Sequence, residues 1–235
     1  NFEIRKQLLK FDDVMNDQRK VIFDQRKEIM RSDDISEMII DMRHEVIETI
    51  VYKSIPAKSY HDEWDAESLT NDVRNYLGLS VPIIEWVKED GIIEKEIISR
   101  LNELSNKYMA ERAVNFGVEV FRQAEKTILL QVLDQGWKDH LLMLDQMRQS
   151  IGLRAYAQKD PLNEYKRESF ELFEEMLDKL RKTITSVLSF IEIQQDATLE
   201  KETHNEPQKV INKKIPRNAV CPLCESGKKY KHCCG

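Results

Sequence analysis

The sequence predicts an all-α protein, and three observations support this fold class. Glycine and proline are scarce, at seven and six of 235 residues, while 33% of the residues are charged. This balance, with many Glu, Lys, Leu and Ile, favours long helices over sheets. Apolar residues recur at spacings of three, four and seven along most of the chain, as in amphipathic helices. All four cysteines lie in the last fifteen residues, outside this helical body.

Residues 1–53 are expected to be helical. An apolar stripe follows the first thirty residues, which are otherwise covered in charge, and a second helical stretch extends from about Ile35 to Tyr52. Thirty residues of helix would span about 45 Å. The first stripe consists of Ile4, Leu8, Phe11, Met15, Ile22 and Ile29.

Residues 54–110 interrupt this pattern and are expected to form a small helical subdomain inserted between longer helices. Pro56 and Pro82, with polar residues between them, indicate loops that join short helices. Helical periodicity returns from Ile83 to about Ser105, with an interruption at Asp90 and Gly91.

Residues 111–192 predict an antiparallel two-helix hairpin. The first helix is expected over 111–150. Asp160 and Pro161 then supply an N-cap and a proline at the first helical position of the second helix. A connection of about nine residues between two long helices makes them antiparallel neighbours.

Residues 193–218 are expected to be a flexible linker, because Gln, Thr, Glu, Asn, Lys and Pro replace the apolar residues there. Charge also changes near this point. From Asn205 to Gly235 the chain has seven Lys or Arg and two Glu, whereas residues 1–204 have 29 basic and 40 acidic residues. The acidic body argues against nucleic acid as the main partner, and the basic end suits an acidic protein surface or anionic lipid.

Residues 219–235 are expected to be a small zinc-binding module. Cys221 and Cys224 form a Cys-x-x-Cys pair, and Cys233 supplies a third thiolate after eight intervening residues. The fourth ligand is either Cys234 or His232. Paired thiolates around a short polar loop suit a tetrahedral zinc ion, so one Zn²⁺ per chain is predicted. The alternative is a set of reactive surface thiols without metal.

Two further residues have competing interpretations. His140 could be catalytic, but a histidine within a helix is more often structural. Tyr156 lies in the short connection of the hairpin, near Arg154 and Lys159. It is either part of an ordinary exposed turn or an aromatic contact that binds a partner through apolar area and a hydroxyl.

The sequence begins without Met, in what reads as a helix, and is expected to be a piece of a longer polypeptide. It shows neither a signal peptide nor a run of about 20 apolar residues that could span a membrane. A cytosolic setting is the simplest interpretation.

Three segments, in family order, resemble SecA, the bacterial preprotein translocase motor. Residues 5–19 are similar to its long scaffold helix, and residues 226–235 to its zinc tail. The third segment, residues 128–177, closely resembles the C-terminal part of SecA through two motifs, LLQVLDQGWKDHL at 129–141 and RAYAQKDPLNEYKRESFELF at 154–173.

The resemblance implies a role for each part of the chain. Residues 1–53 and 111–192 would belong to the helical scaffold, 54–110 to the helical wing, and the hairpin would be the two-helix finger. Tyr156 would touch the unfolded preprotein at the mouth of the SecYEG channel. ATP and Mg²⁺ would bind only in domains upstream of Asn1, so the chain would have no ATPase site and no catalytic residue of its own.

The resemblance also implies partners for the tail. The zinc module would dock the chaperone SecB and anionic phospholipid, and a homodimer is possible. The expected location is the cytoplasm and, peripherally, the cytoplasmic face of the bacterial inner membrane. The basic residues that would make these contacts are Lys213, Lys214, Arg217, Lys228, Lys229 and Lys231.

The sequence departs from the family pattern at two places that bear on this reading. The zinc motif of the family usually begins Cys-x-Cys, and here Cys221 stands one residue early, which affects the loop that SecB would recognise. Gly136 precedes Trp137 where a large apolar residue is common. The alternatives to a motor segment are a helical scaffold with a zinc adaptor tail that only binds proteins, and a zinc-dependent nucleic-acid binder.

Overall fold

The computed structural model describes residues 2–56, 59–151 and 160–192. Over these residues the chain forms seven α-helices and one turn of 3₁₀-helix, His61–Glu63, without a strand, which confirms the all-α prediction. No helix in this part of the chain is both long and apolar enough to cross a membrane. The α-helices are α1 Phe2–Arg31, α2 Ser36–Ser54, α3 Ala66–Leu77, α4 Ile83–Trp86, α5 Glu94–Phe116, α6 Val118–Ile151 and α7 Pro161–Phe190.

The break between α1 and α2 is stabilised from both sides. The side chain of Asp34 accepts a hydrogen bond from the backbone N–H of Ser36 at 2.8 Å, which lowers the pKa of this carboxyl. At the end of α1, the ammonium group of Lys126 on α6 donates to the carbonyls of Met30 and Ser32, at 3.0 and 2.7 Å. These bonds satisfy carbonyls that have no partner within the helix.

The break between α5 and α6 differs from the sequence prediction, which began a helix at residue 111. Instead, residues 111–116 complete α5, and α6 begins at Val118. Gly117 between them has a φ of 88°, a conformation that L side chains rarely adopt. The apolar stripe continues across the break, and periodicity alone therefore misses it.

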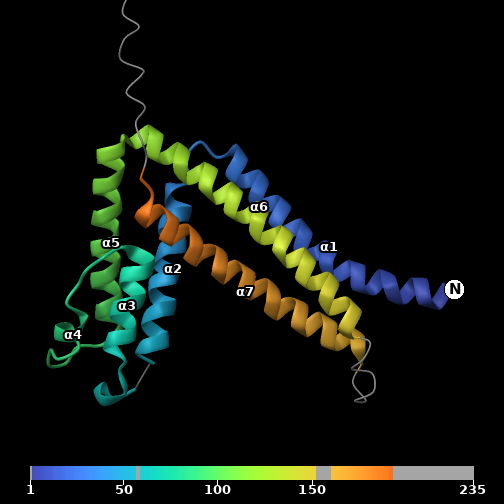
Figure 1. The fold of residues 1–235 in the computed structure, drawn as a ribbon, viewed down its shortest axis with the longest axis horizontal. Coiled ribbons are helices and arrows are strands. Elements are labelled where there is room, and N and C mark those ends of the chain that lie inside the picture. Colours follow the sequence, from blue (N-terminus) through green and yellow to red (C-terminus); the bar gives the residue numbers. More distant parts are fainter. Residues whose placement is uncertain (1, 57–58, 152–159, 193–235) are drawn as a thin grey trace, which may run out of the picture. The chain divides into compact units, whose positions relative to one another are not determined.

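A first hydrophobic core joins α1 and α2 to α5, α6 and α7. Phe121 and Leu129 of α6 pack in it with Ile184 and Leu188 of α7, and all four are at most 1% exposed. In Figure 1, α1 runs alongside α6, and α7 runs back in the direction opposite to α6. The other buried members are Ile22, Ile29, Ile35, Ile39, Met109, Ala113, Leu133, Phe173, Met176 and Leu180.

A second core lies among α3, α4, the C-terminal half of α2 and the N-terminal half of α5. Because α2 and α5 also contribute to the first core, they connect the two. The second core consists of Val46, Ile47, Ile50, Val51, Ile55, Leu69, Val73, Leu77, Ile83, Ile92, Ile97, Ile98 and Leu101.

Helix α3 ends against the C-terminal end of α7. Gly78 follows α3 with a φ of 66°, and a Cβ there would lie 3.4 Å from the hydroxyl of Tyr108 and 3.5 Å from the ring of Phe190. The Tyr108 hydroxyl donates to the carbonyl of Ser189 at 3.1 Å. The Ser186 hydroxyl donates to the carbonyl of Asn75 at 3.2 Å. The second core is thereby attached directly to the hairpin.

Two glycine-to-alanine substitutions are expected to have opposite effects on stability. Gly117→Ala should lower the free energy of unfolding by about 1–3 kcal/mol, because alanine disfavours a φ of 88°. Gly136→Ala should raise it by about 0.5–1 kcal/mol, because this glycine lies within α6 and its added Cβ would meet only Met176, at 3.8 Å. Urea unfolding followed by circular dichroism measures both, and equal effects would contradict this account of the two positions.

Candidate functional site

The predicted site residues of the loop and the tail lie outside the described residues. Their proposed roles therefore stay predictions. These residues are Tyr156, Lys213, Lys214, Arg217, Cys221, Cys224, Lys228, Lys229, Lys231, His232, Cys233 and Cys234. The structure does describe the two helices that lead into and out of the loop, and the helix that packs along them.

Helices α6 and α7 form an antiparallel pair, as the sequence predicted. Gly136 lies opposite Met176, and the rings of His140 and Phe173 are 5.6 Å apart, so numbers rise on one helix as they fall on the other. Helix α7 begins as expected, since the Asp160 side chain accepts from the backbone N–H of Leu162 at 3.1 Å and Pro161 occupies the first turn.

A small apolar cluster supports the loop end of the hairpin. Leu144, Met147 and Ile151 of α6 and Tyr165 of α7 are each at most 8% exposed. The ring of Phe11 on α1 meets the ring of Tyr165 edge-to-face, with centroids 4.9 Å apart. The C-terminal part of α6 and the N-terminal part of α7 are therefore packed against α1.

Ion pairs join α1 to α6 along their length. The guanidinium of Arg148 lies 2.8 Å from the carboxylate of Asp12, and that of Arg26 donates twice to Asp134, at 2.9 and 3.1 Å. These four side chains are 36–42% exposed, so water and salt screen the attraction in both pairs.

A buried polar cluster joins α1 to both helices of the hairpin. The side-chain amide of Gln18 donates from Nε2 to the backbone carbonyl of Ser169 at 3.0 Å, and its Oε1 lies 2.8 Å from Nε2 of His140. The exposed fractions are 9% for Gln18, 2% for His140 and 0% for Ser169. The three residues are far apart in sequence, and the fold alone brings them together.

The bonds of Gln18 assign the protonation of His140. A carbonyl only accepts, so the amide of Gln18 must present its nitrogen to Ser169 and its oxygen to His140. Nε2 of His140 therefore carries the proton, and Nδ1 has no hydrogen-bond partner among the described residues. Burial lowers the pKa of His140, because a charged imidazolium is disfavoured there. This supports the structural interpretation of His140.

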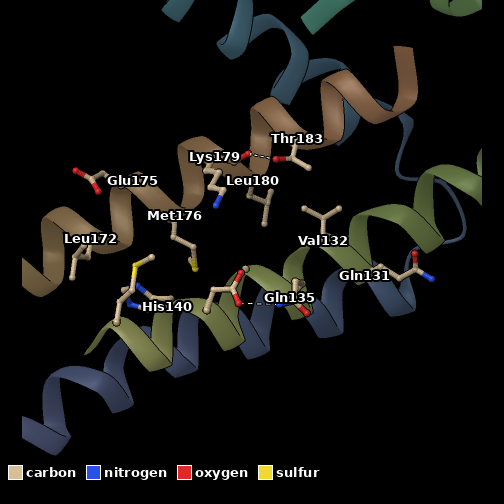
Figure 2. Close-up of a pocket in the computed structure, with 13 residues that line it drawn as sticks. Gln131, Val132, Gln135, His140, Leu172, Glu175, Met176, Lys179, Leu180 and Thr183 are labelled. Atoms are coloured by element: carbon tan, nitrogen blue, oxygen red, sulfur yellow. Dashed lines mark hydrogen bonds between the residues drawn. The ribbon is translucent and has the colours of Figure 1, made fainter. Parts of the chain in front are cut away.

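A groove of about 340 Å³ lies between α6 and α7. Figure 2 shows Met176 and Leu180 of α7 pointing toward α6, and Val132 of α6 pointing back toward α7. Gly136 contributes no side chain to its wall, and polar groups such as Gln135, bonded to Asp139 at 2.9 Å, surround it. The groove could accommodate an apolar group.

A second buried polar cluster lies where α2, α5 and α6 meet. Glu125 is 2% exposed and pairs with Arg122 at 2.7 Å, and burial raises the pKa of its carboxyl. Burial also lowers the pKa of Arg43 to about 10. The guanidinium of Arg43 donates to the hydroxyl of Ser105 at 3.3 Å and to the side chain of Asn106. This cluster links the helices that connect the two cores.

The motifs of the sequence do not single out Gln18, Glu125 or Arg43, although a signal is present for the first two. Glu125 stands four residues after Phe121 and four before Leu129, in phase with the buried stripe of α6. Gln18 likewise follows Phe11 by seven residues and precedes Ile22 by four. A polar residue in phase with an apolar stripe must be buried with a partner.

Comparisons with known proteins agree with this architecture. A family model described as the SecA wing and scaffold domain matches residues 1–192. The chain is also 42% identical, over an alignment of 265 positions, to the protein translocase subunit SecA of Afipia carboxidovorans. That alignment covers all of this chain and 28% of the relative, so the chain spans little more than a quarter of the relative's length.

The buried state of His140 predicts a pH dependence of stability. The pKa of His140 is lowered from 6.5 in the folded state, so the unfolded chain binds the proton more readily. The free energy of unfolding should therefore fall as pH falls from about 7.5 through 6.5, by at most about 1.4 kcal/mol per pH unit from this group. Urea unfolding at several pH values measures the slope.

One variant isolates the contribution of His140 to this slope. His140→Gln removes the titrating ring and should reduce the slope. An unaltered slope in His140→Gln would show that His140 takes up its proton equally well in the folded and unfolded states.

Proposed function

The chain belongs to the SecA family, and we propose that it is the part of a protein translocase that carries movement to the translocating polypeptide. ATP hydrolysis, with its Mg²⁺, would take place in domains outside this chain. The chain itself would contribute the helical scaffold, the helical wing and the two-helix finger. Its role would be mechanical.

The observation that carries this proposal is the packing of α1 along the hairpin. Helix α1 has 30 residues, about 45 Å, and contacts both α6 and α7. Its contacts alternate between apolar clusters and polar links from Asp12 to Met30. A displacement of α1 would therefore move the hairpin with it.

The loop of the hairpin would be the point of contact with the unfolded preprotein, at the mouth of the SecYEG channel. The cluster of Leu144, Met147, Ile151 and Tyr165 supports this idea, because it holds both helices at the loop end against α1. Tyr156 would contact the polypeptide through its apolar ring and its hydroxyl, which suits substrates of varied sequence.

The C-terminal module would recruit partners. Its cysteines would hold zinc, and its lysines would bind the acidic surface of SecB and anionic phospholipid. These contacts would place the protein in the cytoplasm and, peripherally, on the cytoplasmic face of the inner membrane. Assembly as a homodimer is compatible with this role.

Removal of the Tyr156 ring should slow translocation more than ATP hydrolysis. In the full-length protein, Tyr156→Ala is expected to lower the preprotein translocation rate by about threefold to tenfold, the effect of losing about 1 kcal/mol of aromatic contact. Basal ATP hydrolysis should change little. The control is Tyr60→Ala, at a position that is 80% exposed and far from the hairpin in sequence.

Equal losses of translocation and ATP hydrolysis in Tyr156→Ala would count against the finger role. Tyr60→Ala should behave as the unmodified protein in both assays. A comparable translocation defect in Tyr60→Ala would show that the loss is not specific to the loop of the hairpin.

Zinc content gives a separate test of the tail. Elemental analysis after purification with sufficient metal should find one zinc per chain, and Cys221→Ser should lose it. Comparing Cys234→Ser with His232→Ala identifies the fourth ligand, because only the ligand's loss should weaken binding. Chelation should leave the helical circular dichroism of residues 2–192 largely intact. Absence of zinc in the unmodified chain would refute the metal site.

A further inference from the structure

Gln18 is unusual among the described side chains of α1, because it is the one polar side chain there that is buried. It bonds to Ser169 on α7 and to His140 on α6, so a single amide joins α1 to both helices of the hairpin. Neither bond can lengthen without leaving a buried polar group unsatisfied.

The apolar contacts of α1 do not by themselves fix its position along the hairpin. Met15, Ile22 and Ile29 recur every seven residues, and a slide of α1 by seven residues would place one apolar residue where another had been. The free energy of apolar burial depends on the area buried and not on which apolar residues face one another, so it discriminates poorly between the two registers. In coiled coils with such a repeat, a single buried polar residue specifies the register, that is, which residues lie opposite one another.

We propose that Gln18 is a positioning residue that fixes the register of α1 on the hairpin, so that displacement of α1 reaches both hairpin helices without slippage. This inference rests on the mechanical function proposed above. The bonds that carry it are those from the Gln18 amide to the Ser169 carbonyl and to the His140 ring.

A slide of seven residues is disfavoured in either direction. In one direction Phe11 would take the place of Gln18, and the Nε2–H of His140 would lose its acceptor. In the other direction Gln25 would take the place of Gln18, but the amide of Gln18 would enter the apolar cluster around Tyr165, where Phe11 now packs. Each lost buried hydrogen bond, at about 1 kcal/mol, disfavours the shifted register by about fivefold.

The exposed ion pairs discriminate less well. A slide that brings Phe11 to His140 also brings Arg19 to the place of Arg26, and Arg19 could then pair with Asp134. The Asp12–Arg148 pair would be lost, but its side chains are 36–39% exposed and their attraction is screened by water and salt.

The ring of His140 is held for this role. It lies between the rings of Trp137 and Phe173, with centroids 5.5 and 5.6 Å away. The hydroxyl of Ser169 donates to the carbonyl of Lys166, and its small side chain leaves space for the amide of Gln18 to reach the backbone of α7. Both partners of Gln18 therefore have further contacts that hold them in position.

Distance measurements between spin labels test the register directly in the 235-residue chain. Labels are attached at Asp13→Cys on α1 and Thr127→Cys on α6, both exposed positions, with the four terminal cysteines replaced by serine. A slide of seven residues moves α1 by about 10 Å along its axis. The unmodified register should give a single distance.

The decisive variant is Gln18→Met combined with His140→Phe. It removes both polar partners at nearly constant volume, so the chain should fold with a Tm within about 5 °C of the unmodified chain. A second distance, displaced by about 10 Å, should then appear. The shifted register that it reports should be at least about fivefold more populated than in the unmodified chain. Gln25→Met, one heptad further along α1 and exposed, is the matched control and should keep the single distance.

A single unchanged distance in the folded double variant would overturn the inference. Should the double variant not unfold cooperatively, Gln18→Asn gives the same test, because its shorter amide cannot reach both partners. Neither measurement involves translocation, so failure here leaves the proposed function standing. Equal losses in the Tyr156→Ala assays would instead count against the proposed function and leave the register result intact.

Discussion

The packing of α1 against α6 and α7 is the interaction on which the rest of the structure depends. An isolated helix of 30 residues covered in charge would be marginally stable in water, and its order comes from burying a narrow apolar face. That face is provided by Ile22 and Ile29, which are each 2% exposed, and Gln18 fixes its register on the hairpin. Without α1, the hairpin would expose the same face and its loop end would lose the support of Phe11.

Helices α2 and α5 extend this arrangement to the second core. Each contributes to both cores, and the cluster of Glu125, Arg122 and Arg43 lies where they meet α6. Buried charges of this kind add little net stability, but separating one of them from its partner leaves an unpaired buried charge, which is costly. They therefore disfavour positions of the helices in which the pairs are separated. Movement within the chain should consequently involve whole groups of packed helices.

Periodicity and capping residues predicted the all-α class and the antiparallel hairpin, but not every helix boundary. Asp160 and Pro161 begin α7 as expected, because capping is a local interaction. The break at Gly117 could not be predicted from periodicity, since the stripe continues through it. The partners of Gln18 and Glu125 depend on contacts distant in sequence, and only their phase on the helix indicated burial. The predictions for Tyr156 and the cysteines concern residues outside the described ranges.

The central claim, that α1 and the hairpin move as one body, is tested most directly by native-state hydrogen exchange. Backbone amides around Ile22 in α1, Leu133 in α6 and Met176 in α7 should open with the same free energy and the same dependence on denaturant, as one cooperative unit. Exchange of the α1 amides at a clearly lower free energy, while α6 and α7 remain protected, would show that α1 detaches from the hairpin and would contradict the account.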